Sequence, residues 1–148
     1  MDVYTRHTTT LFKIAMIHLG NSIDAEDAVQ EAFFKHLHKA PTFVDETHEK
    51  AWLIRVLINI CKNMTRSFWR RRTVSLADQI ISIEEPEERQ MLSLVMQLPF
   101  SYKTVIHLFY YEDYSVAEIA EILKISQSAV KMRLKRGRAL LKWEWEGE

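Results

Sequence analysis

Apolar residues recur every three or four positions along most of the chain, a spacing that predicts amphipathic helices. The first predicted helix covers residues 2–19 and stops at Gly20. The second runs from a cap at Asn21 or Ser22 to about Lys39, ahead of a proline. The expected core face of this second helix holds Ala25, Val29, either Ala32 or Phe33, and Leu37.

A third helix is predicted to begin near Glu49, and its two faces differ in chemistry. Leu53, Ile60 and Met64, together with either Val56 or Leu57, mark an apolar face. The loop before the helix, residues 40–47, contains two unexpectedly apolar residues, Phe43 and Val44. A polar and cationic stripe with the spacing i, i+4, i+7, i+11 follows the opposite face: Arg55, Asn59, Lys62 and Arg66.

The helical pattern weakens after Arg72, and the acidic stretch at 84–88 offers no apolar face to bury. We therefore predict a flexible linker at 74–90 between two small helical domains, residues 1–73 and 91–148. Only 3 glycines and 3 prolines are present, too few for the many turns of an all-β protein. The expected fold class is all-α.

The segment from Tyr114 to Lys142 has the pattern of a helix-turn-helix. Ser115 and Glu118 form a capping-box sequence before a short helix, and a tight turn at Lys124 follows. Ser126 can then cap a second, basic helix. Two helices joined by so short a turn are typical of winged-helix-like and homeodomain-like DNA-binding domains, whose second helix lies in the major groove.

The second helix of this motif separates into a core face and a candidate DNA face. With Val130 and Leu134 turned inward, the outward positions of its early turns are those that usually reach base edges. Glutamine can bind adenine, lysine can bind guanine or phosphate, and arginine neutralises phosphate. The alternative is a solvated cationic helix end. The predicted base-reading residues are Gln127, Ser128, Lys131 and Lys135, and the predicted phosphate contacts are Arg133, Arg136 and Arg138.

The charges are separated along the chain although they cancel overall, with 20 basic and 20 acidic residues. Residues 50–77 contain seven basic residues and no acid, and residues 124–142 repeat that count. Acids gather at 24–31 and 84–88 instead. Two cationic segments favour a polyanionic partner despite the zero net charge.

The sequence offers no constellation for catalysis, so a nucleic-acid-modifying enzyme is the least favoured class. A single cysteine, Cys61, cannot form an internal disulfide, and it is expected as a buried thiol. His36 and His38 lie two apart on one helix and face different directions, whereas the other four histidines are isolated. We expect no catalytic residue, metal, cofactor or small-molecule substrate. A signal peptide and a membrane span are not expected either, which favours a cytoplasmic protein.

Two stretches read together carry a family resemblance: residues 20–37 with 50–72, and residues 98–141. Their elements DAEDAVQE, AWL and YSVAEIAEILKIS, in this order and spacing, resemble the extracytoplasmic-function (ECF) group of bacterial sigma factors. These proteins are alternative specificity subunits of RNA polymerase. The resemblance implies an N-terminal domain that binds core polymerase and the minus-10 promoter element, and a C-terminal domain that binds the minus-35 element. It also implies an anti-sigma factor as a partner.

The resemblance assigns roles to two further groups of residues. For the acids of the second helix, a purely local role at the positive end of the helix dipole is the alternative. Trp52 is expected in the core rather than on DNA, and for Phe68 and Trp69 both possibilities stay open. The polymerase-binding group is Asp27, Gln30, Glu31 and Phe34, and the minus-10 group is Phe43 and Val44 in the 41–47 loop with Arg55, Asn59, Lys62 and Arg66.

One position departs from the family pattern. The family usually has glycine in the turn between the two DNA-binding helices, and Lys124 stands there in this chain. A non-glycine residue with positive φ costs on the order of 1 kcal/mol, which a cooperative domain tolerates. The main functional alternative is a free-standing helix-turn-helix regulator that binds DNA without polymerase.

Overall fold

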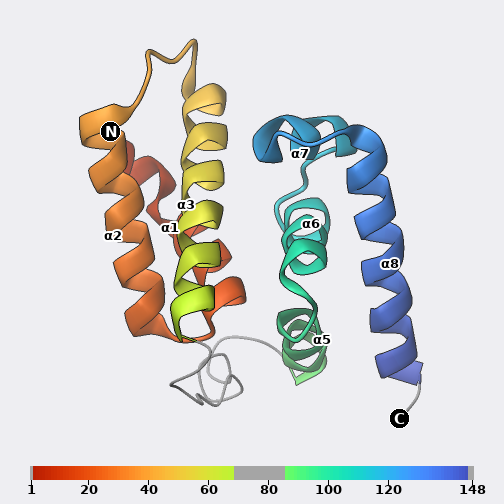
Figure 1. Cartoon of the computed structure of the whole chain (residues 1–148). Helices are drawn as coiled ribbons and strands as arrows, with labels where there is room; N and C mark the ends of the chain where they lie inside the picture. Colours follow the sequence, from red (N-terminus) through yellow and green to blue (C-terminus); the bar gives the residue numbers. More distant parts are fainter. Residues whose placement is uncertain (1, 69–85, 147–148) are drawn as a thin grey trace. The chain divides into compact units, whose positions relative to one another are not determined.

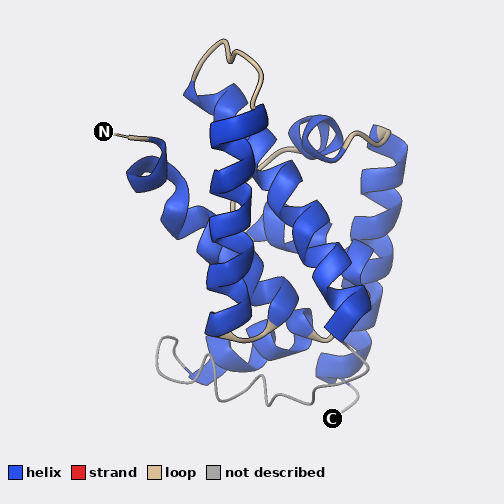
Figure 2. Ribbon diagram, turned by 60° about the vertical axis from the view of Figure 1, so that its left-hand side comes forward, coloured by secondary structure: helices blue, strands red, loops and turns tan. Residues whose placement is uncertain are grey.

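The computed structural model describes residues 2–68 and 86–146, and all regular secondary structure in these ranges is helical (Figures 1 and 2). The chain divides into two compact units, residues 1–74 and 75–148. The prediction of an all-α fold is confirmed.

The first unit is a bundle of three helices, α1 (Val3–Leu19), α2 (Ser22–Lys39) and α3 (Glu46–Phe68). Each helix packs against the other two, and α2 and α3 are joined by the loop at their upper end in Figure 1. The small residues of α2 let its backbone approach its neighbours closely. The buried apolar core includes Leu11, Ile14 and Ala15 of α1, Ala25, Ala28, Val29 and Ala32 of α2, and Leu53, Ile54, Leu57 and Cys61 of α3.

Side-chain caps fix where the helices of this unit begin. The backbone N–H of Thr5 donates to Asp2 Oδ1 at 2.8 Å, and that of Asp24 donates to Asn21 Oδ1 at 2.9 Å. Of the two predicted caps for α2, Asn21 is therefore the one used. Gly20 ends α1 with φ 80°, as predicted, because a residue without Cβ adopts this left-handed conformation freely.

The third helix begins earlier than the sequence predicts, at Glu46 rather than near Glu49. The cause is Asp45, whose Oδ1 accepts the backbone N–H of His48 at 2.9 Å. The loop therefore comprises residues 40–45, not 40–47. An aspartate cap was available in the sequence, but the apolar periodicity that located the helix starts only one turn later.

The prediction that Leu37 belongs to the core of α2 is wrong, because this side chain is 77% exposed. The buried face of α2 continues from Ala28 and Ala32 to His36, one turn further along, and not to Leu37. Of the other open alternatives, Ala32 and Leu57 are buried, whereas Phe33 and Val56 are half-buried.

The second unit contains α5 (Pro86–Met96), α6 (Phe100–Tyr110), α7 (Val116–Leu123) and α8 (Gln127–Glu146). The long α8 packs against each of the other three. The helix α5 already begins at Pro86, so residues 86–90 are helical and the prediction of a linker up to residue 90 is wrong. Proline at the first position followed by glutamates favours a helix start. The rest of the predicted linker, residues 74–85, lies outside the described residues, as does Trp69; the side chain of Phe68 is not described either.

A glycine allows α6 and α8 to approach closely. A Cβ added at Gly137 would lie 2.9 Å from Ile106 Cγ1, closer than real Cβ contacts. Ile106 is itself buried, together with the apolar residues that surround it. The core of this unit is formed by Val95, Val105, Ile106, Leu108, Ile119, Ile122, Val130 and Leu134.

Candidate nucleic-acid interface

Both predicted caps of the helix-turn-helix are present. Ser115 Oγ accepts the backbone N–H of Glu118 at 3.1 Å, and the backbone N–H of Ser115 donates to Glu118 Oε1 at 2.8 Å. This pair is a complete capping box at the start of α7. Ser126 Oγ accepts the backbone N–H of Ala129 at 3.0 Å and so caps α8. The caps fix the directions of the two helices on either side of the turn.

The turn between α7 and α8 has a residue in the left-handed conformation, although this residue is not a glycine. Lys124 adopts φ 59° and ψ 46°, and its backbone N–H donates to the carbonyl of Ala120. The N–H of Ile125 donates to the same carbonyl at 3.1 Å. These bonds satisfy an acceptor at the end of α7 and require the left-handed residue between the helices, although it is not a glycine.

The outward face of α8 is available to a ligand. Val130 and Leu134 are buried, as predicted from their spacing. Arg133 is half-buried, and the guanidinium of Arg138 donates from Nη1 to Tyr110 Oη at 3.1 Å, which restrains that side chain. The remaining predicted contacts are all exposed: Gln127, Ser128, Lys131, Lys135 and Arg136.

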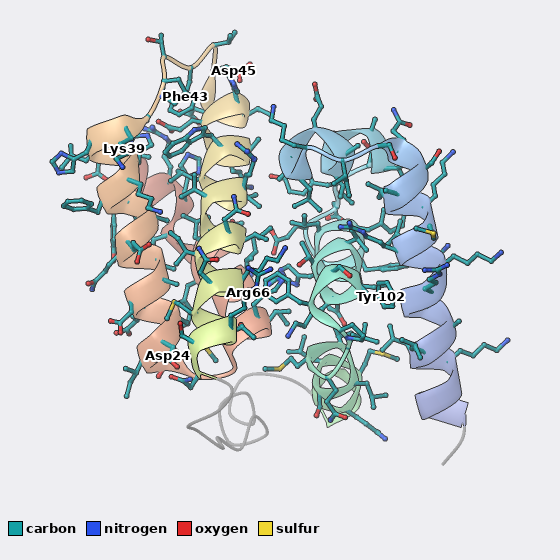
Figure 3. All side chains as sticks on the ribbon, in the orientation of Figure 1. Asp24, Lys39, Phe43, Asp45, Arg66 and Tyr102 are labelled. Carbon is teal, nitrogen blue, oxygen red and sulfur yellow. The ribbon has the colours of Figure 1, made fainter. Side chains whose placement is uncertain are left out.

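The predicted stripe on α3 also reaches solvent. Asn59, Lys62 and Arg66 are exposed, and Arg55 is half-buried. Figure 3 shows Arg66 on the later turns of α3, whereas Phe43 lies in the loop that precedes the helix. Because the helix lies between them, an extended polyanion along α3 could contact both the loop and the cationic stripe.

The two apolar residues of the loop have different surroundings. Val44 is 87% exposed, and its backbone N–H donates to His48 Nδ1 at 3.3 Å. Phe43 is half-buried among the rings of three other residues. Its ring centroid lies 5.7 Å from that of His36, 5.4 Å from that of His48 and 5.8 Å from that of Trp52. We call these four residues the aromatic cluster. Trp52 is half-buried in this cluster, so it packs on protein, as expected, but at the edge of the core.

A carboxylate beneath the loop connects all three helices of the first unit. Arg6 Nη2 lies 2.8 Å and His7 Nε2 3.0 Å from Glu49 Oε1, and His36 Nε2 lies 3.0 Å from Oε2. We call these four residues the Glu49 node. Desolvation raises the pKa of Glu49, but the hydrogen bonds from Arg6, His7 and His36 outweigh it and lower the pKa to about 2.

Sequence reasoning missed the Glu49 node because its members are far apart in the chain. Glu49 lies 42 residues from His7 and 13 from His36. Periodicity describes neighbours on one helix and contains no information about pairs on different helices. The sequence feature that could have indicated the node is the position of Glu49, an acidic residue in the first turn of α3, one turn before the buried Leu53.

The exposed face of α2 contains the predicted polymerase group and two further residues. Asp27, Gln30 and Glu31 are exposed, and Phe34 is 62% exposed with its ring 4.3 Å from that of His38. Ile23 and Leu37 are 71% and 77% exposed and continue the same face at helical spacing. We call the stripe formed by Ile23, Asp27, Gln30, Phe34 and Leu37 the α2 stripe.

Within residues 2–68 and 86–146, no cluster of three or more histidine, cysteine or acidic side chains is arranged to hold a metal ion. Cys61 is buried, as predicted. In the same part of the chain, no helix combines the length and the apolar character needed to cross a membrane.

Comparison with known proteins decides the family. Residues 3–72 match the family model of sigma-70 region 2, and residues 88–141 match that of sigma-70 region 4. The ECF RNA polymerase sigma factor SigL of Mycobacterium tuberculosis is 31% identical over 143 residues, which cover 89% of this chain and 80% of SigL. The chain belongs to the ECF family of RNA polymerase sigma factors.

Other relatives agree with this assignment. The RNA polymerase sigma factor SigV of Bacillus subtilis is 28% identical over 144 residues, covering 93% of this chain and 86% of SigV. Among solved structures, the sigma factor RpoE of Bartonella quintana, determined in complex with the anti-sigma factor NepR, has the same fold. Its TM-score is 0.77 at 20% identity, with 94% of this chain and 91% of RpoE covered.

The family membership defines the role of the ECF sigma factor. It is an alternative sigma factor, a transcription-initiation subunit that directs RNA polymerase to promoters, and not an enzyme. The alternative of a free-standing helix-turn-helix regulator is not favoured, because both the region 2 and the region 4 models match.

Proposed function

We propose that this ECF sigma factor divides promoter recognition and polymerase binding among three surfaces. Residues 1–73 bind core RNA polymerase and the minus-10 element, and residues 91–148 bind the minus-35 element. The observation that carries the proposal is exposure: every residue assigned to the three groups is exposed or half-buried, although all of them except Phe43 and Val44 lie on helices with a buried face.

The minus-35 element is duplex DNA, and α8 has the side chains to read it. Gln127 and Ser128 in the first turn, followed by Lys131 and Lys135, can reach base edges, because the buried Val130 and Leu134 direct them outward. Arg133, Arg136 and Arg138 neutralise phosphates. Replacing one of these arginines should reduce the salt dependence of duplex binding by about one counterion and weaken binding to all sequences alike.

The minus-10 element is read as a melted strand in this proposal. A base taken out of the stack needs a surface for its face and hydrogen-bond partners for its edge. Phe43 and Val44 supply the apolar surface, and Asn59 supplies a donor and an acceptor. Arg55, Lys62 and Arg66 follow the strand as phosphate partners along α3, which has no acid between Lys50 and its end.

Core RNA polymerase binds the α2 stripe together with Glu31. The stripe combines apolar and acidic side chains, and an exposed patch of this kind is typical of a protein interface. Ile23 and Leu37 extend the surface to both ends of α2. Asp27 and Glu31 supply the charge that selects a basic partner surface.

An anti-sigma protein is the second macromolecular partner that we propose, as in the Bartonella quintana complex. The α2 stripe is a surface that such a protein would need to cover in order to exclude polymerase. We also propose a cytoplasmic location for the ECF sigma factor, because it acts together with RNA polymerase. An anti-sigma protein encoded beside it should reduce initiation in a purified system in proportion to its concentration.

Run-off transcription with purified core polymerase tests the polymerase surface. The full-length Asp27→Arg variant should lose initiation and core binding, because the charge reversal faces the partner. Glu121→Arg makes the same change on an exposed residue of α7 and serves as the matched control, with core binding kept. Core binding by Asp27→Arg equal to that of the control would contradict the assignment of α2.

A further inference from the structure

One side chain, His36, belongs to both the Glu49 node and the aromatic cluster. Its Nε2 lies 3.0 Å from Glu49 Oε2, and its ring stacks on that of Phe43 with an interplanar angle of 19°. Trp52 meets the same ring edge-on at 6.0 Å. His36 therefore connects the three-helix bundle to the loop that contains Phe43.

The node fixes the orientation of the Glu49 carboxylate. The side chain of Glu49 is 12% exposed, and its Oε1 is bound by Arg6 and His7, both from α1. With Oε1 restrained in this way, Oε2 points to α2, where it accepts a hydrogen bond from the Nε2–H of His36. That hydrogen bond defines both the tautomer of His36 and the plane of its ring.

Phe43 depends on this ring because the loop offers it few other restraints. Residues 40–45 form no helix or strand, and the loop is tied to α3 through Asp45 and through the bond from Val44 to His48. The position of the Phe43 ring is therefore defined by contacts with the rings of His36, His48 and Trp52. His36 differs from the other two because it is stacked on Phe43 and bonded to Glu49.

We propose that Glu49, acting through His36, is a positioning residue that orients Phe43 for a base of the melted minus-10 strand. Neither Glu49 nor His36 touches DNA in this proposal. The inference rests on the proposed role of the loop. Stacking itself accepts any base, but the ring sets where the edge of the stacked base lies. A misplaced Phe43 therefore costs selectivity at that base and leaves the other promoter contacts intact.

The two functions of His36 can be separated by substitution. His36→Phe keeps a ring against Phe43 and loses the donor to Glu49, whereas His36→Gln keeps an N–H donor and loses the ring. Each should reduce discrimination between the preferred and a substituted base at one minus-10 position by about tenfold, roughly the value of one stacking contact. His7→Phe is the matched control, because it removes the other histidine bond to the same carboxylate at the same distance.

The measurement uses full-length sigma factor bound to core polymerase. Its probes are single-stranded oligonucleotides carrying the minus-10 sequence that the unmodified holoenzyme selects from a randomised pool, and the same oligonucleotides with single base changes. Phe43→Leu identifies the affected position. In the double variant with Phe43→Leu, His36→Phe should cause no further loss, because the ring it positions is absent.

A purely structural node predicts a different pattern. His36→Phe and His7→Phe would then lower the melting temperature alike and leave discrimination unchanged at every position, which overturns the proposal. If a His36 variant does not fold, Glu49→Gln replaces it, since this change keeps one oxygen for Arg6 and His7 and should still lose discrimination. If Phe43→Leu itself leaves discrimination unchanged, the proposed role of the loop fails, which is a distinguishable result.

Discussion

The two units of the ECF sigma factor present their candidate DNA-binding residues in different ways. In the second unit these residues lie on consecutive turns of α8, and buried Val130 and Leu134 determine their direction. In the first unit Phe43 and Val44 lie in an irregular loop, and contacts from two helices, α2 and α3, determine their surroundings. A helix face is a local property of the chain, whereas the geometry of a loop depends on residues distant in sequence.

The interiors of the two units also differ in the interactions that hold their helices together. The first unit contains an ionised carboxylate that is 12% exposed and has three partners. The second unit also has a carboxylate that is 12% exposed, Glu112, but its ion pair with His107 joins residues only five apart, whereas α6 and α8 meet in close apolar packing at Ile106 and Gly137. The first unit should therefore be sensitive to changes in charge, and the second to changes in volume.

The largest expected effect is that of Glu49→Leu. Removing the carboxylate leaves Arg6, His7 and His36 without their shared acceptor, and breaking a buried pair in this way costs about 3 kcal/mol or more. Hydrogen exchange of the full chain should show faster exchange in residues 3–68 and unchanged exchange in residues 86–142. Equal acceleration in both ranges would contradict the separation of the two units.

The same comparison explains what the sequence could predict. Helix caps such as Ser115 and Ser126, the buried face of α8 and the exposed stripe of α3 all follow from local spacing, and the structure contains them. The position of the strained residue of the turn, Lys124, follows from the family resemblance instead, because the family has glycine there, and the structure establishes its left-handed conformation.

The wrong predictions share a cause as well. Leu37 has the spacing of a core residue, but the third helix places His36 inward because Glu49 offers it an acceptor. The start of α5 at Pro86 was missed because an acidic segment lacks apolar periodicity, although proline and glutamate favour a helix start. Both errors occurred where a polar interaction, and not apolar burial, decides the structure.

Acid should destabilise the first unit through Glu49. The pKa of Glu49 is lowered to about 2 in the folded chain, against 4.5 for an unperturbed glutamate. Its contribution is fully present above pH 4.5 and is lost as pH falls towards 2, which amounts to about 3 kcal/mol.

The control for this pH dependence is Glu49→Gln, which cannot ionise. The difference in unfolding free energy between the unmodified chain and this variant should shrink as pH falls from 4.5, measured by denaturant titration of the first unit with hydrogen exchange as the readout. A difference that stays constant with pH would show that the charge of Glu49 adds no stability.

A change in side-chain volume at Gly137 should destabilise the second unit and leave the first unit unchanged. Gly137→Val places branched carbon atoms where a single Cβ already lies 2.9 Å from Ile106 Cγ1. Such overpacking costs about 2 kcal/mol, which exceeds the gain in helix propensity from replacing glycine. Faster exchange should be confined to residues 86–142, and binding to minus-35 duplex should weaken. If the contact is the cause, Gly137→Val together with Ile106→Ala, which removes Cγ1, should lose less stability than the two single changes added together.

The smallest effect concerns the left-handed residues that end α1 and α7. Gly20 has φ 80° in the first unit, and Lys124 has φ 59° in the second, so the units solve the same geometric problem with different residues. Lys124→Gly should stabilise the second unit by up to about 1 kcal/mol, because the strain of a side chain at positive φ exceeds the added entropy of the unfolded chain. Glu121→Gly, inside α7, should lose about 1 kcal/mol and shows that the sign depends on conformation, not on glycine itself. Thermal unfolding of the full chain measures both.

Stabilisation by Lys124→Gly with unchanged minus-35 affinity would mean that the strain is tolerated without any role in reading DNA, whereas a loss of affinity would mean that the lysine side chain contributes to binding.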